Sequence, residues 1–347
     1  MTRCLSILVF IICFSLYGTS SKFTDTFAQE VTSQSSSEAE KCLEGDVNAC
    51  ARLGYNYERG RGVEQDYEKA ARFYRESCDA NGISAGCSNL GLLYLQGKGV
   101  PEDVDEGLRL LSESCERGFS FSCTKLALIY LEGTIVPEGT EEAIRLLNKG
   151  CDGVDAAGCT YLGTLYYHGD GVPKDLEKAA HVYRKGCDHS NAESCKYLAA
   201  MYWYGDIAPK DTEKAAQLYR KSCDHRDAEA CNLLGVLYQD GSGVPKDYSE
   251  SVHLYRKGCD GGHARGCTNL GYLYQDGSGV PKDYFESAHF YRKGCDGGDT
   301  RGCANLGYFY ENGLSVAQDH SEAVRLYRKS CDGGGSWSCN RLKTLEE

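Results

Sequence analysis

One sequence pattern returns at a fixed interval along most of this 347-residue chain. The stretch that begins at Cys267 reads CTNLGYLYQDGSGVPKDYFESAHFYRKGC. Similar stretches begin at Cys50, Cys87, Cys123, Cys159, Cys195, Cys231 and Cys303, at a step of 36 residues except for 37 between Cys50 and Cys87. A period of this size is typical of a solenoid, in which each unit packs mainly against its neighbours.

Each repeat predicts two antiparallel helices. In the unit around Cys231, apolar residues at helical spacing predict a first helix over residues 228–239. Gly235 lies inside that helix at a cost of about 1 kcal/mol, so we expect the partner helix to approach closely there. Gly241 is expected to end the helix in the left-handed conformation, and Pro245 prevents its continuation.

The second helix of the same repeat is expected to begin at Asp247. The Asp247 side chain is a favourable N-cap, and Glu250 three residues later predicts a capping box. Val244 in the preceding turn is expected to point inward. Helices of about three turns are not stable alone in water, so stacking on neighbouring repeats must stabilise them.

Eighteen of the 20 cysteines form nine neighbouring pairs outside the apolar N-terminus. An even set in an exported chain predicts disulfides that join the end of one repeat to the start of the next. Zinc is the alternative, but the pairs lack C-x2-C spacing and no histidine recurs beside them. The expected bridges are Cys42–Cys50, Cys78–Cys87, Cys115–Cys123, Cys151–Cys159, Cys187–Cys195, Cys223–Cys231, Cys259–Cys267, Cys295–Cys303 and Cys331–Cys339.

The N-terminus has the pattern of a secretory signal peptide. Arg3 precedes an apolar run over residues 5–16, and small residues follow up to Ser20. We expect a signal peptide at residues 1–20, a disordered Ser/Thr-rich linker at 21–38 and a repeat solenoid at 39–347. The run is short for a membrane span, which disfavours an uncleaved anchor. The predicted location is secreted or periplasmic, without stable membrane insertion after cleavage.

The net charge of −12 makes nucleic acid an unfavourable partner, because an acidic chain repels a phosphate backbone. No catalytic residues, metal ligands or cofactor are predicted. A single S-x-x-K stretch, Ser122 to Lys125, lacks the S-D-N and K-T-G partners of serine β-lactamases and is interpreted as a solvent-facing helix start. The eight histidines are scattered, apart from three that share a position on second helices.

Three motifs carry a family resemblance: L-G-x-x-Y in the first helix, G-x-G-V-P-x-D in the turn and A-x-x-x-Y in the second helix. Over residues 42–342 the chain resembles Sel1-like repeats, relatives of the tetratricopeptide repeat, and its cysteine pairs resemble the Helicobacter cysteine-rich proteins. The resemblance implies an all-α fold: an α/α solenoid, a right-handed superhelix of eight disulfide-clipped helix-turn-helix repeats with a concave binding face.

Resemblance to tetratricopeptide arrays also implies which residues line the groove. They occupy positions two, five, eight and nine after the first cysteine of a repeat, and aromatic residues cluster in the fourth and fifth repeats. The implied groove residues are Asn89, Leu92, Leu95, Lys125, Tyr161, Tyr167, Tyr197, Trp203, Tyr204, Gln239, Asn269, Tyr272, Gln275, Asn305 and Tyr308. Asn89, Asn269 and Asn305 are expected to hold a peptide backbone. Packing between repeats is the alternative role for some of the aromatic residues.

The expected function is that of an exported, non-enzymatic scaffold that binds a peptide or protein in its groove. The alternative is binding or weak hydrolysis of β-lactams or cell-wall peptides, which rests on resemblance to the cysteine-rich branch and not on a site. A third hypothesis, an assembly factor of the mitochondrial intermembrane space, is disfavoured by the secretory N-terminus.

Overall fold

The computed structural model describes residues 33–81, 85–135, 139–153 and 155–346. All regular structure in these ranges is helical, which confirms the all-α prediction. The chain divides into two compact units, Met1–Gly153 (unit 1) and Val154–Glu347 (unit 2). The expected signal peptide and most of the expected linker lie outside the described residues.

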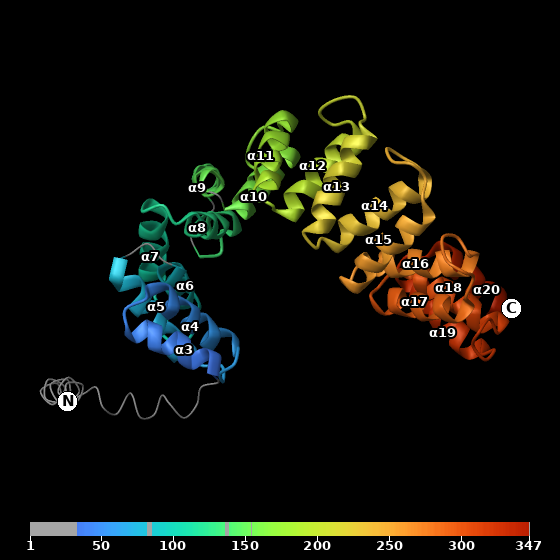
Figure 1. Ribbon diagram of the computed structural model, residues 1–347, viewed down its shortest axis with the longest axis horizontal. Coiled ribbons are helices and arrows are strands. Elements are labelled where there is room, and N and C mark those ends of the chain that lie inside the picture. The colour runs from blue at the N-terminus through green and yellow to red at the C-terminus, as the bar shows by residue number, and fades with distance from the viewer. Residues whose placement is uncertain (1–32, 82–84, 136–138, 154, 347) are drawn as a thin grey trace, which may run out of the picture. The chain divides into compact units, whose positions relative to one another are not determined.

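The described helices follow one another as antiparallel pairs within each unit (Figure 1). Unit 1 contains α3 (Ser33–Leu43), α4 (Val47–Arg59), α5 (Tyr67–Asn81), α6 (Ala85–Gln96), α7 (Val104–Glu116), α8 (Ser120–Glu132) and α9 (Thr140–Asp152). Unit 2 contains α10 (Ala156–His168), α11 (Leu176–Asp188), α12 (Ala192–Tyr204), α13 (Thr212–Asp224), α14 (Ala228–Asp240), α15 (Tyr248–Asp260), α16 (Ala264–Asp276), α17 (Tyr284–Asp296), α18 (Thr300–Asn312), α19 (His320–Asp332) and α20 (Ser336–Glu346). Residues 33–38, expected in the linker, form the first part of α3.

The helix ends follow the predicted turn chemistry. Gly241 ends α14 with φ 73°, and its N–H donates to the carbonyl of Leu237. The Asp247 carboxylate caps α15 by accepting from the backbone N–H of Glu250 at 3.0 Å. The Glu250 side chain, expected to complete a capping box, instead accepts from Arg220 at 3.2 Å. The capping box is therefore only half formed, because Glu250 joins two neighbouring repeats.

A tyrosine ring packed on a glycine forms the centre of most repeats. A Cβ added at Gly235 would lie 2.7 Å from the ring of Tyr255, so only glycine allows this approach. Tyr255 is 1% exposed. The predicted packing reason for the in-helix glycine is confirmed. The other such contacts are Gly54–Tyr74, Gly163–Tyr183, Gly271–Tyr291 and Gly307–Tyr327.

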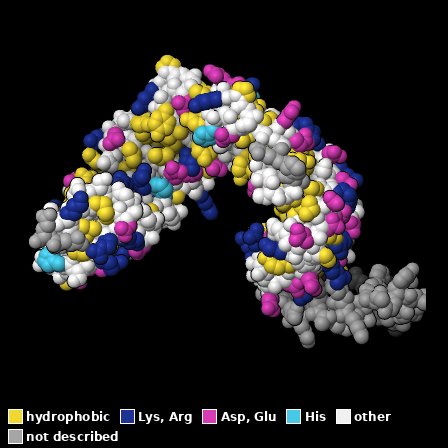
Figure 2. Space-filling view, turned by 180° about the vertical axis from the view of Figure 1, so that it is seen from behind, with side chains coloured by type: hydrophobic (Ala, Val, Ile, Leu, Met, Phe, Trp, Pro, Cys, Tyr) yellow, Lys and Arg dark blue, Asp and Glu magenta, His cyan; other side chains and the backbone are white. Residues whose placement is uncertain are grey.

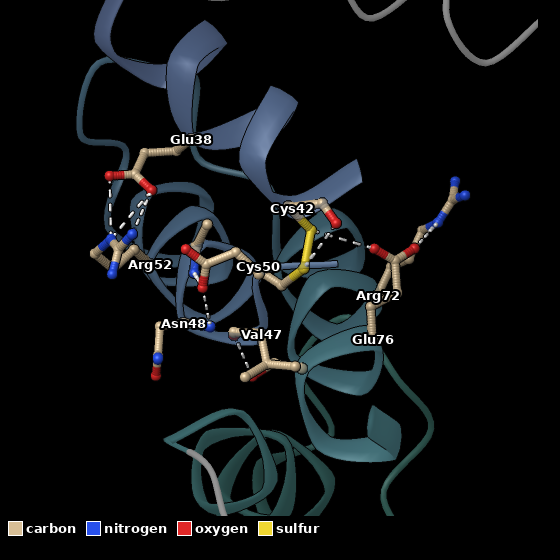
Figure 3. Close-up of a disulfide and its surroundings, with 11 residues drawn as sticks. Glu38, Cys42, Val47, Asn48, Cys50, Arg52, Arg72 and Glu76 are labelled. Atoms are coloured by element: carbon tan, nitrogen blue, oxygen red, sulfur yellow. Dashed lines mark hydrogen bonds and ion pairs between the residues drawn. A yellow bond between two sulfur atoms is a disulfide. The ribbon is translucent and has the colours of Figure 1, made fainter. Parts of the chain in front are cut away.

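Disulfides join the second helix of one pair to the first helix of the next. Cys259 near the end of α15 and Cys267 in the first turn of α16 have Cα atoms 4.5 Å apart. Figure 3 shows the corresponding Cys42–Cys50 bridge between α3 and α4. All 18 cysteines from Cys42 to Cys339 are disulfide-bonded, as predicted.

A second, noncovalent contact also recurs between repeats. An arginine of one second helix donates to a tyrosine hydroxyl on the first helix of the following pair, so it acts where helices from different repeats meet. Its members are Arg75–Tyr94 at 2.8 Å, Arg184–Tyr202 at 3.1 Å, Arg220–Tyr238 at 2.6 Å, Arg256–Tyr274 at 2.6 Å and Arg292–Tyr310 at 2.7 Å. Among the described helices, none has the length and apolar character needed to cross a bilayer.

Removal of one bridge should lower the stability of the array. We expect Cys259→Ala with Cys267→Ala to lose about 2–3 kcal/mol of unfolding free energy, because the unfolded chain regains the entropy of a closed loop. Thermal unfolding followed by circular dichroism measures the loss. The difference from wild type should vanish once both proteins are fully reduced; a difference that persists after reduction would point to lost packing instead.

The cap of α16 predicts a pH dependence. His263 Nδ1 accepts from the backbone N–H of Gly266 at 3.2 Å, which requires an unprotonated ring nitrogen. Burial lowers the pKa of His263. The charge of Arg265 lowers this pKa further, whereas the carboxylates of Glu229, Asp227 and Asp299 raise it. A lowered folded-state pKa means that the unfolded chain binds the proton more readily. The cap therefore stabilises the protein at pH values above the unfolded-state pKa of His263. This stabilisation is lost as the pH falls through the folded-state pKa.

We therefore expect His263→Asn, which keeps a capping side chain that does not titrate, to become the more stable protein as the pH is lowered from neutral. The gain should be about 1 kcal/mol, the usual contribution of an N-cap. Melting temperatures measured across this pH range test it. His289→Asn, at an exposed position on α17, is the control and should follow wild type. Parallel curves for wild type and His263→Asn would contradict the prediction.

Candidate functional site

The groove residues implied by the repeat positions lie on the first helices of the pairs. Four tyrosines among them are exposed: Tyr161 at 44%, Tyr204 at 72%, Tyr272 at 49% and Tyr308 at 43%. Leu95 is buried. The others are half-buried: Asn89, Leu92, Lys125, Tyr167, Tyr197, Trp203, Gln239, Asn269, Gln275 and Asn305. Packing thus leaves several aromatic rings of the first helices open to solvent. Figure 2 shows hydrophobic side chains among charged ones on the viewed surface.

In unit 1, first helices enclose a groove of about 660 Å³, which we call the unit 1 groove. It brings together residues of α4, α6 and α8, and it contains three of the implied residues, Asn89, Leu92 and Lys125. Its lining is Tyr55, Glu58, Arg59, Tyr67, Ala85, Asn89, Leu92, Leu93, Gln96, Lys98, Phe119, Phe121 and Lys125. The volume lies in the range of ligand sites.

In unit 2, the first helices α10 and α12 form a smaller pocket of about 250 Å³. The implied residues Tyr167 and Tyr197 line it, together with Thr164, His168, Tyr183, Ala200 and Met201. The rings of Tyr183 and Tyr197 lie 5.3 Å apart, a distance typical of packed aromatic pairs. This pocket combines apolar and aromatic surface with hydroxyl groups.

The tyrosine hydroxyls of this pocket remain protonated at neutral pH. Burial raises the pKa of Tyr183 to about 12. Burial also raises the pKa of Tyr167, and the neighbouring Asp206 carboxylate, which accepts from its hydroxyl at 3.1 Å, raises it further. The pKa of Tyr197 rises because of burial and the nearby Glu193. The three tyrosine hydroxyls therefore act as neutral hydrogen-bonding groups in this pocket.

The two adjacent aromatic residues at the end of α12 differ in their surroundings. Trp203 is half-buried against the core, and the ammonium group of Lys210 lies 3.8 Å from its ring centre. Tyr204 is among the most exposed large hydrophobic side chains of the described residues. Tyr204 is thus the better placed of the two to contact a partner, whereas Trp203 also contributes to packing.

Two implied groove residues have a structural role. Gln239 accepts from the hydroxyl of buried Tyr255 at 2.7 Å, and Gln275 accepts from Tyr291 at 2.5 Å. Glutamates occupy the equivalent place in the end repeats, where Glu58 accepts from Tyr74 and Glu311 from Tyr327, both at 2.6 Å. The eighth position of these repeats therefore satisfies the tyrosine hydroxyl of the same repeat.

The asparagines expected to hold a peptide backbone are partly engaged within the protein. The amide of Asn269 donates to the side-chain oxygen of Asn232 at 2.9 Å. Asn89 and Asn305 interact with the hydroxyls of the buried residues Tyr74 and Tyr291, respectively. Burial raises the pKa of both phenols, and each asparagine lowers it by a smaller amount.

The S-x-x-K stretch lies at the start of α8. Ser122 is fully buried and donates to the hydroxyl of Ser114 at 2.9 Å, so its interpretation as a solvent-facing residue is wrong. The ammonium group of Lys125 lies 4.9 Å from the ring centre of Phe121. A buried serine that is paired with another serine gives no support to a nucleophile at this position.

One group of potential metal ligands occurs among the described residues: Cys42, Cys50 and Glu76. Figure 3 shows the two sulfur atoms joined to each other, with Glu76 close to Cys42 and paired with Arg72. A disulfide offers no thiolate to a metal. These residues are accordingly a structural bridge, not a metal centre.

Several residues of the unit 1 groove were not predicted from the sequence. Tyr55 and Arg59 occupy positions five and nine after Cys50, which are the repeat positions that define the implied groove residues of the later repeats. Lys98 comes from a turn and Phe121 precedes the cysteine of its helix. The repeat pattern carries no signal for these two, because it concerns the helix positions that follow the cysteine.

The structure therefore defines a protein of stacked helix pairs whose first helices present open, partly aromatic surfaces. The profile of the Sel1 repeat matches residues 47–82, 84–119, 120–155, 156–191, 192–227, 228–263, 264–299 and 300–335. The chain belongs to the Sel1 repeat family. It is a disulfide-bonded Sel1 repeat scaffold, an architecture typical of protein–protein interaction.

Solved structures include several similar proteins. One is c5321, a protective antigen present in uropathogenic Escherichia coli strains (27% identity, TM-score 0.71, covering 90% of this chain and 67% of that one). A Sel1 repeat protein from Oxalobacter formigenes is 23% identical, with TM-score 0.65 and 90% of each chain covered. Helicobacter pylori cysteine rich protein B is 31% identical over 40% of this chain and 99% of its own, with TM-score 0.33. A search of curated proteins found no match.

The paired roles of Gln239 and Tyr255 predict a specific stability pattern. We expect Gln239→Leu to cost about 1–3 kcal/mol, because it leaves a buried hydroxyl without a partner. Adding Tyr255→Phe should recover most of the loss, and Gln239→Glu should be nearly neutral because Glu58 and Glu311 fill the same role. Thermal unfolding measures all three variants. An unchanged melting temperature for Gln239→Leu would show that the residue is not structural.

Proposed function

We propose that this protein is an exported scaffold that binds a peptide or protein segment along the first helices of its repeats. The observation that carries the proposal is the exposure of aromatic rings at first-helix positions that the fold does not need. Tyrosine at such positions offers a large, rigid contact area with a hydroxyl at its tip, which is typical of binding anchors.

The local geometry in unit 2 supports this role. The pocket between α10 and α12 is large enough for an apolar side chain, and exposed Tyr204 ends α12. Two tyrosines at the fifth repeat position, Tyr272 of α16 and Tyr308 of α18, are also exposed. A partner segment that crosses several first helices would meet such rings in turn.

Export is supported by the cysteines. Eighteen disulfide-bonded cysteines are typical of proteins in oxidising compartments, in agreement with the signal-like N-terminus of the sequence. We infer a secreted or periplasmic location. Burial of Ser122 removes the sequence feature closest to a β-lactamase motif, which leaves the hydrolase alternative without a supporting residue.

The proposal is tested by selecting displayed random peptides on the oxidised protein and measuring their affinity by calorimetry. For peptides that bind unit 2, we expect Tyr204→Ala with Tyr197→Ala to weaken binding about tenfold or more, as removal of aromatic anchors does. Phe285→Ala is the matched control, because Phe285 is 70% exposed but lies on a second helix. Failure to select any peptide, or equal losses with the control, would contradict the proposal.

A further inference from the structure

The unit 1 groove carries an excess of positive charge in a chain whose net charge is −12. Three cationic residues, Arg59, Lys98 and Lys125, line it, against a single carboxylate, Glu58. That carboxylate is already engaged, because it accepts from Tyr74 at 2.6 Å and pairs with Arg59 at 3.5 Å. The lining therefore has a net positive charge that its own acidic residue does not cancel.

The two lysines of the groove have no carboxylate partner among the described residues. The Lys98 ammonium group lies 5.6 Å from the ring centre of Tyr67, and that of Lys125 lies 4.9 Å from Phe121. Elsewhere in the protein, cations commonly pair with carboxylates on their own helix. Examples are Arg109–Glu106 at 2.6 Å, Arg145–Glu142 at 2.5 Å and Arg325–Glu322 at 2.6 Å. The aromatic rings hold the two lysines in place without neutralising them.

The groove lining also contains uncharged aromatic, apolar and amide side chains. The guanidinium groups of Arg59 and Arg61 lie 5.8 and 5.1 Å from the ring centre of Tyr55. Leu92 adds an apolar surface, and Gln96 adds an amide. The site therefore combines dispersed positive charge with aromatic, apolar and amide groups, which fits a polypeptide better than a small inorganic anion.

The extent of the groove sets the length of its occupant. Most of its lining comes from three successive first helices, and helices packed side by side lie about 8–10 Å apart. Two such steps correspond to about six residues of extended chain at about 3.3 Å per residue. A longer polyanion such as nucleic acid would meet the negative charge of the rest of the chain.

We propose that the unit 1 groove binds an extended acidic peptide segment whose Asp and Glu carboxylates meet Arg59, Lys98 and Lys125 while an apolar residue lies between them. This inference rests on the proposed binding function and adds the class of partner and the site. Charge complementarity sets the preference, because carboxylates gain attraction at Lys98 and Lys125, which have no carboxylate partner among the described residues, while Arg59 adds positive charge beside them.

The test uses the full oxidised protein and two fluorescein-labelled peptides of about six residues, the length of the groove. One peptide has Asp and Glu residues around a leucine; the other has Asn and Gln in their place. Fluorescence anisotropy should show binding of the acidic peptide, weakened as ionic strength rises, and at least about tenfold weaker binding of the amide peptide.

Variants at the two lysines locate the site. Lys98→Gln with Lys125→Gln should weaken binding of the acidic peptide about tenfold, whereas Lys98→Arg with Lys125→Arg should retain it. The matched control is Lys246→Gln with Lys282→Gln in unit 2. It removes the same charge from lysines that also lie over tyrosine rings, both at 4.8 Å, and should bind like wild type.

Each other outcome overturns the inference. Equal binding of the two peptides removes the acidic preference, and equal losses in both glutamine variants show an effect of net charge without a site. If neither peptide binds at about 1 mM while selected peptides still bind through Tyr204, the acidic groove is wrong and the proposed function stands. If selected peptides also fail, the proposed function is wrong as well.

Discussion

Among the described residues no helix is long enough to persist alone, and this constraint determines how the rest is built. A typical helix here has 13 residues, which is marginal for an isolated helix in water. Stability must therefore come from contact with neighbouring helices, and the tyrosine on glycine contact supplies it within most repeats. At Gly235 even one added carbon atom would meet the ring of Tyr255 at 2.7 Å. The glycine thus lowers intrinsic helix propensity and in exchange lets a large buried ring pack against the backbone.

Two other contacts join one repeat to the next, and they differ in what they depend on. The disulfides limit the freedom of the unfolded chain and require an oxidising compartment. The arginine–tyrosine hydrogen bonds act in the folded state and do not depend on redox conditions. The two are complementary, because the bridges lie at one end of the helices and the arginine contacts lie farther along them, as Cys259–Cys267 and Arg256–Tyr274 illustrate.

The repeat made much of the fold predictable from sequence. The position of the helices, the left-handed Gly241, the Asp247 cap and the cysteine pairing all follow from residues that return in phase. The side-chain details did not follow. Glu250 suited a capping box locally, yet it contacts Arg220 of the preceding repeat. Ser122 was assigned to the surface because its helix begins there, but Ser114 of the preceding helix covers it. Both errors concern contacts between repeats, which a pattern within one repeat cannot reveal.

The predicted groove residues also differ in whether the pattern of a single repeat reveals their role. The eighth position of a repeat looked suitable for binding, but in four repeats its polar side chain satisfies a buried tyrosine hydroxyl. Where the second helix carries buried Leu111 instead of tyrosine, the eighth position is Leu95, which is buried. This position therefore varies with the interior of its own repeat. Other positions also serve the buried hydroxyl in some repeats, as Thr164 does at the fifth position by pairing with Tyr183 at 3.1 Å. The side chains of Tyr272, Lys125 and Tyr204 do not have this role, so chemistry can change at such residues without loss of the repeat frame. The candidate sites are accordingly cationic and aromatic in unit 1 but mainly aromatic in unit 2.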